Sequence, residues 1–266
     1  MSFLKSFAKA AWCFCLLPLS KKRLVLDIVR SSAGLHGESF SFAEDGLCTI
    51  HNSDFTHRKD FKLAYEEAKN TGSWRGWDLR WRAYLYCLLA KTGSRLEGDF
   101  VECGVNLGGN AQLIVSFLNF AVLKKRLYLF DTFQGFDPSL LSKSEKRNIA
   151  EHYVYTPCYE AVKSRFAGKP YVSIIKGTVP LSLEQVHFDK ICFLSIDMNC
   201  ARPEVEAVRY LWKYITPGGI ILLDDYGFKN HHEQKKALDR LATELAFDII
   251  QLPTGQGLVF KANPSS

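Results

Sequence analysis

Acidic side chains end two apolar runs of this sequence, where they could bind a ligand or a metal ion. Asp197 ends the run 191–197, and Asp224 and Asp225 end the run 219–225. If both runs are parallel strands, their carboxyl ends meet at one edge of the sheet and bring the three carboxylates together. Carboxylates in such proximity repel one another, and a hard divalent cation with oxygen ligands compensates them. We therefore predict that Asp197, Asp224 and Asp225 bind Mg²⁺. A helix-capping role is the alternative for Asp225.

A glycine-rich turn follows a third apolar run, in Gly98-Asp-Phe-Val-Glu-Cys-Gly-Val-Asn-Leu-Gly-Gly-Asn110. Gly104, Gly108 and Gly109 let the backbone turn sharply and approach a ligand, and Asn110 can cap an apolar helix that begins at Ala111. The free N–H groups of that helix start would face the ligand. The pattern predicts a nucleotide-cofactor site. The alternative is a turn whose glycines serve only its packing.

Asp131 ends the next apolar run, 126–131, and this strengthens the cofactor interpretation. It follows the glycines by about 20 residues, the spacing expected of a second-strand acid that binds ribose hydroxyls. The turn does not match Gly-x-Gly-x-x-Gly, the fingerprint of dinucleotide sites. A methyl-donor site therefore fits this unit better than a dinucleotide site.

Two histidines follow the acidic pair and are candidates for proton transfer. His231 and His232 stand at the start of the expected helix 230–246. The simpler interpretation is that these histidines lie at a solvent-exposed helix start. The alternative is that they face the substrate and transfer a proton. Asp197 is the other candidate proton acceptor, because the helix after it begins several residues later and leaves its side chain available for chemistry.

Strands and helices must alternate to position these residues. We expect one helical stretch at 60–90, and then a strand at 99–103, a helix at 111–122, a strand at 126–131, a helix at 158–167, strands at 171–175 and 191–197, a helix at 203–215, a strand at 219–224 and a helix at 230–246. Such alternation predicts an α/β fold with a doubly wound, mostly parallel, seven-stranded sheet. Residues 247–252 and 258–261 predict a terminal antiparallel hairpin. This Rossmann-like arrangement is typical of class I methyltransferases rather than of dehydrogenases.

Composition limits the remaining classes. The chain has 266 residues, of which 47% are hydrophobic, enough for one main domain. The net charge of +6 is scattered, so no nucleic-acid partner is indicated. Eight cysteines without a Cys-x-x-Cys pair suit a reduced, cytoplasmic protein. We expect a methyltransferase domain at 96–266, preceded by a helical cap or lid at 24–95.

Residues 1–23 are apolar and basic but too short to span a bilayer, which takes about 20 apolar residues. Weak association with the inner face of a membrane and packing on the protein's own core are equally compatible with this pattern.

Four motifs together resemble the macrocin O-methyltransferase family. They are Glu102-Cys-Gly-Val with Gly108-Gly109, Phe130-Asp-Thr-Phe-Gln-Gly-Phe136, Ser195-Ile-Asp-Met-Asn199 and Leu223-Asp-Asp-Tyr-Gly227. That family contains S-adenosylmethionine- and Mg²⁺-dependent enzymes that methylate sugar hydroxyls, and the resemblance covers roughly residues 75–261.

The resemblance implies roles for particular positions. Glu102, Gly104 and the turn through Val105, Asn106, Gly108, Gly109 and Asn110 would hold the methionine part of S-adenosylmethionine. Asp131 would bind the ribose, with Thr132 and Asp197 in the same cofactor site, and Gly177 and Thr178 would lie near the adenine. The segments 132–137 and 139–149 resemble the family's mobile active-site loop.

One departure concerns the acceptor. The family often has Asp-x-Asp-Leu-Tyr where this chain has Asp197-Met-Asn-Cys-Ala201, so Asn199 replaces an acid and an aromatic side chain is missing. A macrolide acceptor is therefore not assumed. We expect an O-methyltransferase acting on a sugar or glycosylated small molecule or glycan, as a homo-oligomer. A catechol-type O-methyltransferase, a nicotinamide oxidoreductase and a non-catalytic partner of a glycan-assembly complex are the alternatives.

Overall fold

The computed structural model describes residues 40–152 and 155–262. The described residues divide into two compact units, one of residues 40–43 and 47–53 and the other of residues 44–46, 54–152 and 155–262. Strands β1 (Phe42–Glu44) and β2 (Leu47–Thr49) form a separate two-stranded sheet. The expected membrane-associated segment 1–23 lies outside the described residues, and the domain boundary expected at residue 95 stays a prediction. Among the helices of the described ranges, none has the length and apolar character needed to cross a bilayer.

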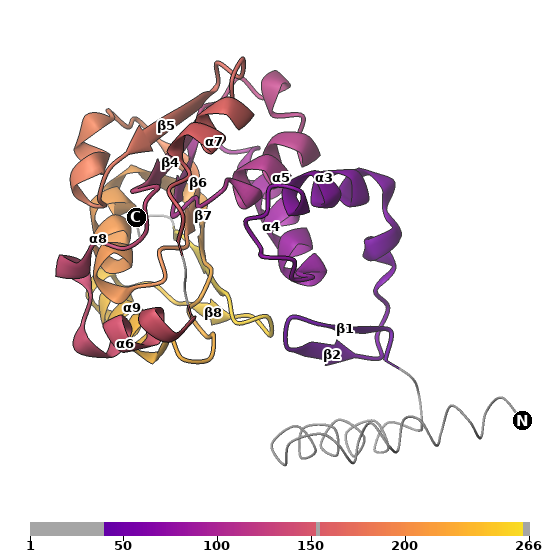
Figure 1. Ribbon diagram of the computed structural model, residues 1–266. Helices are drawn as coiled ribbons and strands as arrows, with labels where there is room; N and C mark the ends of the chain where they lie inside the picture. The colour runs from indigo at the N-terminus through magenta and orange to yellow at the C-terminus, as the bar shows by residue number, and fades with distance from the viewer. Residues whose placement is uncertain (1–39, 153–154, 263–266) are drawn as a thin grey trace, which may run out of the picture. The chain divides into compact units, whose positions relative to one another are not determined.

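The larger unit contains a seven-stranded sheet, of which Figure 1 labels β4 to β8. Its strand order is β5-β4-β3-β6-β7-β9-β8. The first five strands in this order are parallel, and β9 runs antiparallel to both β7 and β8. The predicted sheet with its terminal hairpin is thus confirmed. The strands are β3 (Asp99–Cys103), β4 (Leu127–Asp131), β5 (Val172–Lys176), β6 (Ile191–Ile196), β7 (Ile215–Leu223), β8 (Ile250–Gln251) and β9 (Gly257–Phe260).

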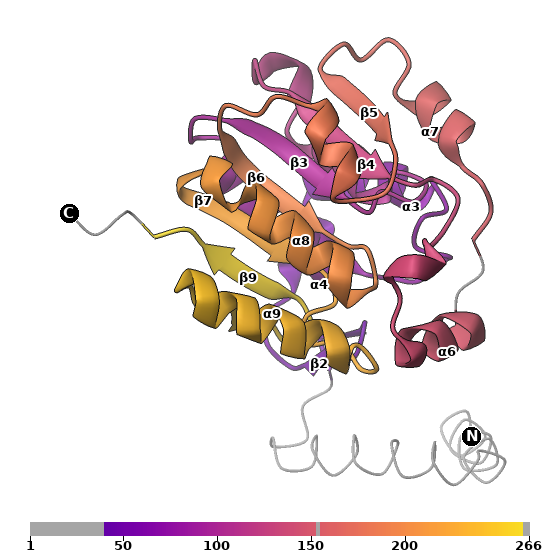
Figure 2. The same ribbon diagram turned by 90° about the vertical axis from the view of Figure 1, so that its left-hand side faces the viewer.

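Helices cover both faces of this sheet (Figure 2). The apolar residues of α8 and α9 join β3, β6 and β7 in a buried core on one face, and α4 packs on β6, β7 and α5 on the other. Strand β6 is buried along its whole length, as expected for a central strand covered on both sides. The helices are α3 (Lys59–Lys69), α4 (Arg80–Gly93), α5 (Gly109–Phe117), α6 (Lys143–His152), α7 (Tyr159–Arg165), α8 (Ala201–Leu211) and α9 (His232–Leu245).

Short 3-10 helices connect several of these elements. They are η1 (Asp54–His57), η2 (Phe120–Val122), η3 (Pro138–Leu140), η4 (Leu181–Gln185) and η5 (Trp212–Tyr214).

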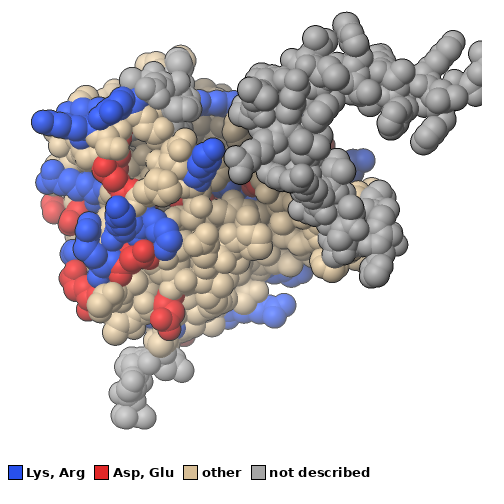
Figure 3. All heavy atoms as spheres, turned by 90° about the horizontal axis from the view of Figure 1, so that it is seen from below, with Lys and Arg blue, Asp and Glu red and all other residues tan. Residues whose placement is uncertain are grey.

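On the face seen in Figure 3, lysine and arginine side chains stand beside acidic ones toward one side, and a broad area next to them carries few charges.

Register aligns the carboxyl ends of four strands. Cys103 is paired with Phe130 on β4 and with Ile196 on β6, and Ile196 is paired with Leu223 on β7. The residues that follow extend this ladder, since Asp197 N donates to Cys103 O at 2.8 Å and Asp224 N donates to Ile196 O at 2.9 Å. The glycine turn, Asp131, Asp197 and Asp224 therefore leave the sheet at the same edge.

Three expected helices differ from the structure. The helix expected at 203–215 begins at Ala201 and ends at Leu211, where η5 follows, and β7 begins at Ile215 instead of the expected residue 219. The stretch 60–90 is not one helix, because a loop at 70–79 separates α3 from α4 and contains Gly72, Arg75 and Gly76 with positive φ angles. The helix expected at 111–122 begins at Gly109 and ends at Phe117, and Asn119 in the left-handed conformation separates it from η2. Left-handed residues cannot continue an α-helix, which explains both breaks.

Candidate active site

A cavity of about 530 Å³ lies at the carboxyl edge of the sheet. Its walls include Gly104, Asn106, Asp131 and Thr132 of the predicted cofactor site, Gly177 and Thr178 after β5, the three predicted metal ligands Asp197, Asp224 and Asp225, and His231. The structure thus brings both groups of predicted residues to one cavity. The other predicted residues of the cofactor site do not line the cavity and lie behind its wall. They are Glu102, Val105, Gly108, Gly109 and Asn110.

The glycine turn makes a close backbone contact with the acid-bearing end of β6. Gly104 has φ +91°, and a Cβ atom at this position would lie 1.8 Å from the carbonyl oxygen of Asp197. Only glycine fits so near another backbone. Gly108, also left-handed, is the N-cap of α5. The predicted capping role of Asn110 is therefore wrong, since this residue lies inside the first turn and its Oδ1 accepts a hydrogen bond from Trp74 Nε1 at 3.3 Å.

Asp131 organises the glycine turn from the neighbouring strand. Its Oδ2 accepts hydrogen bonds from the backbone N–H groups of Val105 at 2.7 Å and Asn106 at 2.8 Å, and its Oδ1 accepts from Phe133 N at 2.7 Å. The Thr132 hydroxyl lies 3.4 Å from Oδ1, but its single proton also reaches the backbone oxygen of Gly135. A carboxylate offers about four acceptor sites, so a ribose hydroxyl can replace Thr132 as the fourth donor. The ribose-binding role stays a prediction, and the bonds to the turn are an addition that the sequence did not indicate.

We expect Asp131→Ala to weaken S-adenosylhomocysteine binding by roughly 10- to 150-fold, because it removes a charge-assisted acceptor together with the support of the glycine turn. Calorimetric titration of the folded variant measures this effect. Asp131→Asn is the matched variant, because it keeps one oxygen for the turn while losing the charge. Wild-type affinity in a folded Asp131→Ala protein would show that the cofactor binds elsewhere.

The three predicted metal ligands converge. One carboxylate oxygen of each of Asp197, Asp224 and Asp225 lies within 4.8 Å of the others. Burial raises the pKa of Asp197 well above its ordinary value, and repulsion from the two other acids adds to the rise. Burial, followed by the Asp224 charge, raises the pKa of Asp225 to about 6, although His231 and Arg82 oppose this. These donors fit a divalent cation, which favours their ionised forms.

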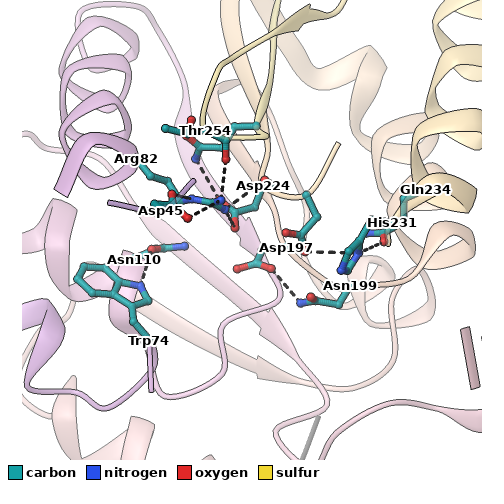
Figure 4. A network of polar contacts seen from close by, with 12 residues as sticks. Asp45, Trp74, Arg82, Asn110, Asp197, Asn199, Asp224, His231, Gln234 and Thr254 are labelled. Carbon is teal, nitrogen blue, oxygen red and sulfur yellow. Dashed lines mark hydrogen bonds and ion pairs between the residues drawn. The ribbon is translucent and has the colours of Figure 1, made fainter. Parts of the chain in front are cut away.

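Arg82 on α4 is a member of this site that the sequence did not reveal. Its Nη1 donates to Asp224 Oδ2 at 2.7 Å, and its other nitrogens donate to Asp45 and to the backbone oxygen of Thr254 (Figure 4). Gln256 Nε2 donates to Asp224 Oδ1 at 3.0 Å. Burial disfavours the charged guanidinium, but the charges of Asp224 and Asp45 hold its pKa above the ordinary value. Arg82 therefore fixes Asp224 and compensates part of the acidic charge.

His231 is buried, unlike the solvated helix start expected of both histidines, and His232 is exposed. The Nδ1 atom of His231 contacts the amide oxygen of Gln234 (Figure 4). The same atom lies 3.8 Å from Asp225 Oδ2. Asn199, which replaces an acid of the family motif, donates to Asp197 Oδ1 at 3.0 Å. His231 and Asn199 thus both contact predicted metal ligands, and the proton-acceptor role of His231 stays a prediction.

Glu204 on α8 is a buried acid behind His231. Its Oε1 accepts hydrogen bonds from Gln234 Nε2 at 2.9 Å and from Met198 N at 3.0 Å. Burial, with added repulsion from Asp225, raises its pKa from 4.5 to about 8. The folded protein therefore holds this proton more tightly than the unfolded chain does.

Stability should depend on pH through Glu204. Because its folded-state pKa is raised, its contribution is fully present below about pH 4.5 and is lost as the pH rises through about 8. Relative to Glu204→Gln, the wild-type free energy of unfolding is expected to fall across this window by up to about 1.4 kcal/mol per pH unit. Urea denaturation of both proteins at several pH values measures the difference. Parallel pH profiles would contradict the assigned shift.

The segment that resembles a mobile active-site loop forms part of the cavity wall through Phe136, Asp137, Leu140 and Asn148. It is not irregular throughout, since it contains η3 and most of α6. Glu145 Oε1 accepts a hydrogen bond from Ala201 N at 2.6 Å, at the start of α8. This contact joins the segment to the backbone that follows Asp197.

The fold and the site together define a class I methyltransferase. Sheet order, terminal hairpin, glycine turn and strand-end acids all belong to this class. The model of the macrocin-O-methyltransferase (TylF) family matches residues 80–252, and the chain belongs to this family. It is therefore an S-adenosylmethionine-dependent O-methyltransferase, as its motifs indicated.

Solved structures share the fold at low sequence identity. The O-methyltransferase NovP superimposes with a TM-score of 0.61 at 20% identity, over 68% of this chain and 80% of its own. The calicheamicin methyltransferase CalS11 gives 0.54 at 13% identity, over 80% and 95%. The methyltransferase PaMTH1 of Podospora anserina, bound to S-adenosylhomocysteine, gives 0.50 at 15% identity, over 94% and 99%. Among curated proteins, none matches the sequence.

Proposed function

We propose that this enzyme transfers the methyl group of S-adenosylmethionine to a hydroxyl group of a sugar or glycosylated acceptor, with Mg²⁺ bound by Asp197, Asp224 and Asp225. The observation that carries the proposal is the opening of the glycine turn and of these three acids into one cavity. The cofactor and the acceptor can therefore meet there. CalS11, which has the same fold, is described as a TDP-rhamnose 3′-O-methyltransferase, and this supports a sugar acceptor.

The cavity also has aromatic walls that suit a sugar ring. Trp77, Phe136, Tyr155 and Phe228 line it together with the acids. Trp77 is 60% exposed although it is a large apolar side chain. Aromatic faces beside polar groups are typical of binding sites for small molecules that combine apolar and hydroxyl surfaces.

The chain's own residues orient the acceptor and receive its proton. A hydroxyl group loses its proton with difficulty near neutral pH, and Mg²⁺, when bound, supplies positive charge that lowers the hydroxyl pKa. Arg82 and Gln256 hold Asp224 in place, and Asn199 orients Asp197. We assign the proton to Asp197 or His231, the two candidate acceptors that line the cavity. Holding both partners in one cavity supplies the proximity that the transfer needs.

Two steps test this function. Calorimetry first measures S-adenosylhomocysteine binding to the full chain. Methyl transfer with Mg²⁺ is then measured over nucleotide sugars, glycans and catechols. Methylation of sugars supports the proposal. Methylation of catechols alone would instead assign a catechol-type enzyme, which also binds two acceptor oxygens near a metal. The family match leaves no support for the nicotinamide oxidoreductase or the non-catalytic alternative.

A further inference from the structure

The loop at 70–79 lies directly on the glycine turn. The Ser73 hydroxyl accepts a hydrogen bond from Gly109 N at 3.2 Å, and Asn106 Nδ2 donates to the backbone oxygen of Ser73 at 3.3 Å. Trp74 Nε1 donates to Asn110 Oδ1 at 3.3 Å (Figure 4). A Cβ atom on Gly109 would lie 2.7 Å from Ser73 Cβ, so the glycine admits this contact. The loop is thus built into the turn that we assign to the cofactor.

Arg75 is the charged residue of this loop that lines the cavity. It shares the wall with Gly104, Asn106 and Asp131. Its φ angle is +50°, a left-handed conformation that costs a non-glycine residue free energy. Its guanidinium lies 5.5 Å from the centre of the Tyr155 ring. A costly backbone conformation that aims a charged side chain at a ligand cavity is typical of a functional residue.

The other strong cations of the described cavity wall have different neighbours. Arg82 is bound to Asp45 and Asp224. Lys229 follows the acidic pair Asp224-Asp225 on the loop after β7, beside the proposed metal site. At the first turn of α5, the Gly109 N–H that could bind an anion already donates to Ser73. Among the cations of the described cavity wall, Arg75 is thus the one carried by the loop that contacts the glycine turn.

We propose that Arg75 binds the carboxylate of the amino-acid part of S-adenosylmethionine, and that Ser73 and Trp74 hold Arg75 over the glycine turn for this purpose. The inference rests on the proposed cofactor site. A guanidinium matches a carboxylate with two parallel hydrogen bonds, so it fixes the orientation of the amino-acid part as well as binding it. The sequence contains Arg75 within an expected helix, where this role is not visible.

Two ligands that differ in the amino-acid part test the proposal. S-adenosylhomocysteine carries the carboxylate, and 5′-methylthioadenosine lacks the whole amino-acid part. Arg75→Asn removes the charge, and asparagine tolerates the left-handed backbone well. We expect this variant to bind S-adenosylhomocysteine roughly 10- to 150-fold more weakly than the wild type in calorimetry, with unchanged affinity for 5′-methylthioadenosine. Arg75→Lys should lose less, because it keeps the charge without the planar fork.

The other outcomes distinguish a failure of this inference from a failure of the proposed cofactor site. Unchanged S-adenosylhomocysteine affinity in Arg75→Asn overturns the inference. Equal weakening of both ligands also overturns it, because the substitution would then have disturbed the loop instead of one contact. Lys229→Ala is the matched variant, because it removes one positive charge from the same cavity. If it weakens S-adenosylhomocysteine binding as much as Arg75→Asn does, the ligand carboxylate is attracted by the positive charge of the cavity in general, and the specific contact with Arg75 is overturned. A wild-type protein that binds 5′-methylthioadenosine but not S-adenosylhomocysteine refutes this inference alone, and one that binds neither refutes the proposed cofactor.

Discussion

Treatment with EDTA is expected to abolish methyl transfer by this enzyme, and added Mg²⁺ is expected to restore it. The reason is the uncompensated charge at the sheet edge. Half-buried Asp197 and buried Asp225 have raised pKa values, and they lie beside a third acid, Asp224, whose two oxygens already bind Arg82 and Gln256. One guanidinium does not balance this cluster, because Asp45 shares it.

Asp197→Asn is expected to lower turnover by about 100-fold or more while leaving S-adenosylhomocysteine affinity nearly unchanged. Asparagine keeps the shape of the side chain but loses the negative charge and the capacity to accept a proton. Asp137→Asn is the matched control, because Asp137 also lines the cavity but its carboxylate caps η3 through Ser139. This control is expected to keep its metal requirement.

Full activity in EDTA would remove the metal from the mechanism and leave Asp197 as a metal-free proton acceptor. Loss of cofactor binding in Asp197→Asn would mean that this acid belongs to the donor pocket. Turnover measured with saturating S-adenosylmethionine, together with calorimetry of S-adenosylhomocysteine, separates these outcomes.

The sequence predicted the sheet and the meeting of the acids because both depend on local patterns. Apolar runs of strand length identify β3, β4, β6 and β7, and parallel pairing then brings the residue after each strand to one edge. Asp131, Asp197 and Asp224 needed no knowledge of side-chain contacts to be placed there.

The residues that hold these acids could not be predicted in the same way. Arg82 reaches Asp224 across 142 positions of the chain, and nothing in the helix that contains Arg82 marks it apart from Arg80. Arg80 instead pairs with Glu44. Contacts of this kind follow from how α4 packs on the sheet, which is set by apolar residues elsewhere in the helix.

The loop at 70–79 had a local signal that helical periodicity concealed. Gly72 and Gly76 flank Ser73-Trp-Arg75, and two glycines so close together interrupt a helix. The aromatic spacing from Trp74 to Trp81 suggested one continuous helix face. In the structure Trp74 and Trp77 instead line the cavity, so the break provides a wall of the site.

Gly104→Ala is expected to be the most damaging single substitution in the glycine turn. The added Cβ atom would lie 1.8 Å from the carbonyl oxygen of Asp197, in a backbone conformation with φ +91°. Relief requires the ends of β3 and β6 to separate, although Gly104 N and Asp197 N both belong to the ladder that joins these strands to their neighbours. We expect a loss of more than about 3 kcal/mol of unfolding free energy, together with loss of S-adenosylhomocysteine binding.

Gly168→Ala distinguishes the close contact from the backbone conformation. Gly168 has φ +75°, and a Cβ atom there would meet no atom within 4 Å. It should therefore cost only the left-handed penalty, about 1–2 kcal/mol, and leave cofactor binding intact. Chemical denaturation and calorimetry of both variants measure the two effects. If Gly104→Ala and Gly168→Ala lowered the free energy of unfolding equally, the ends of β3 and β6 would be able to move apart at little cost. The inference that the glycine turn and Asp197 form a rigid junction would then be wrong.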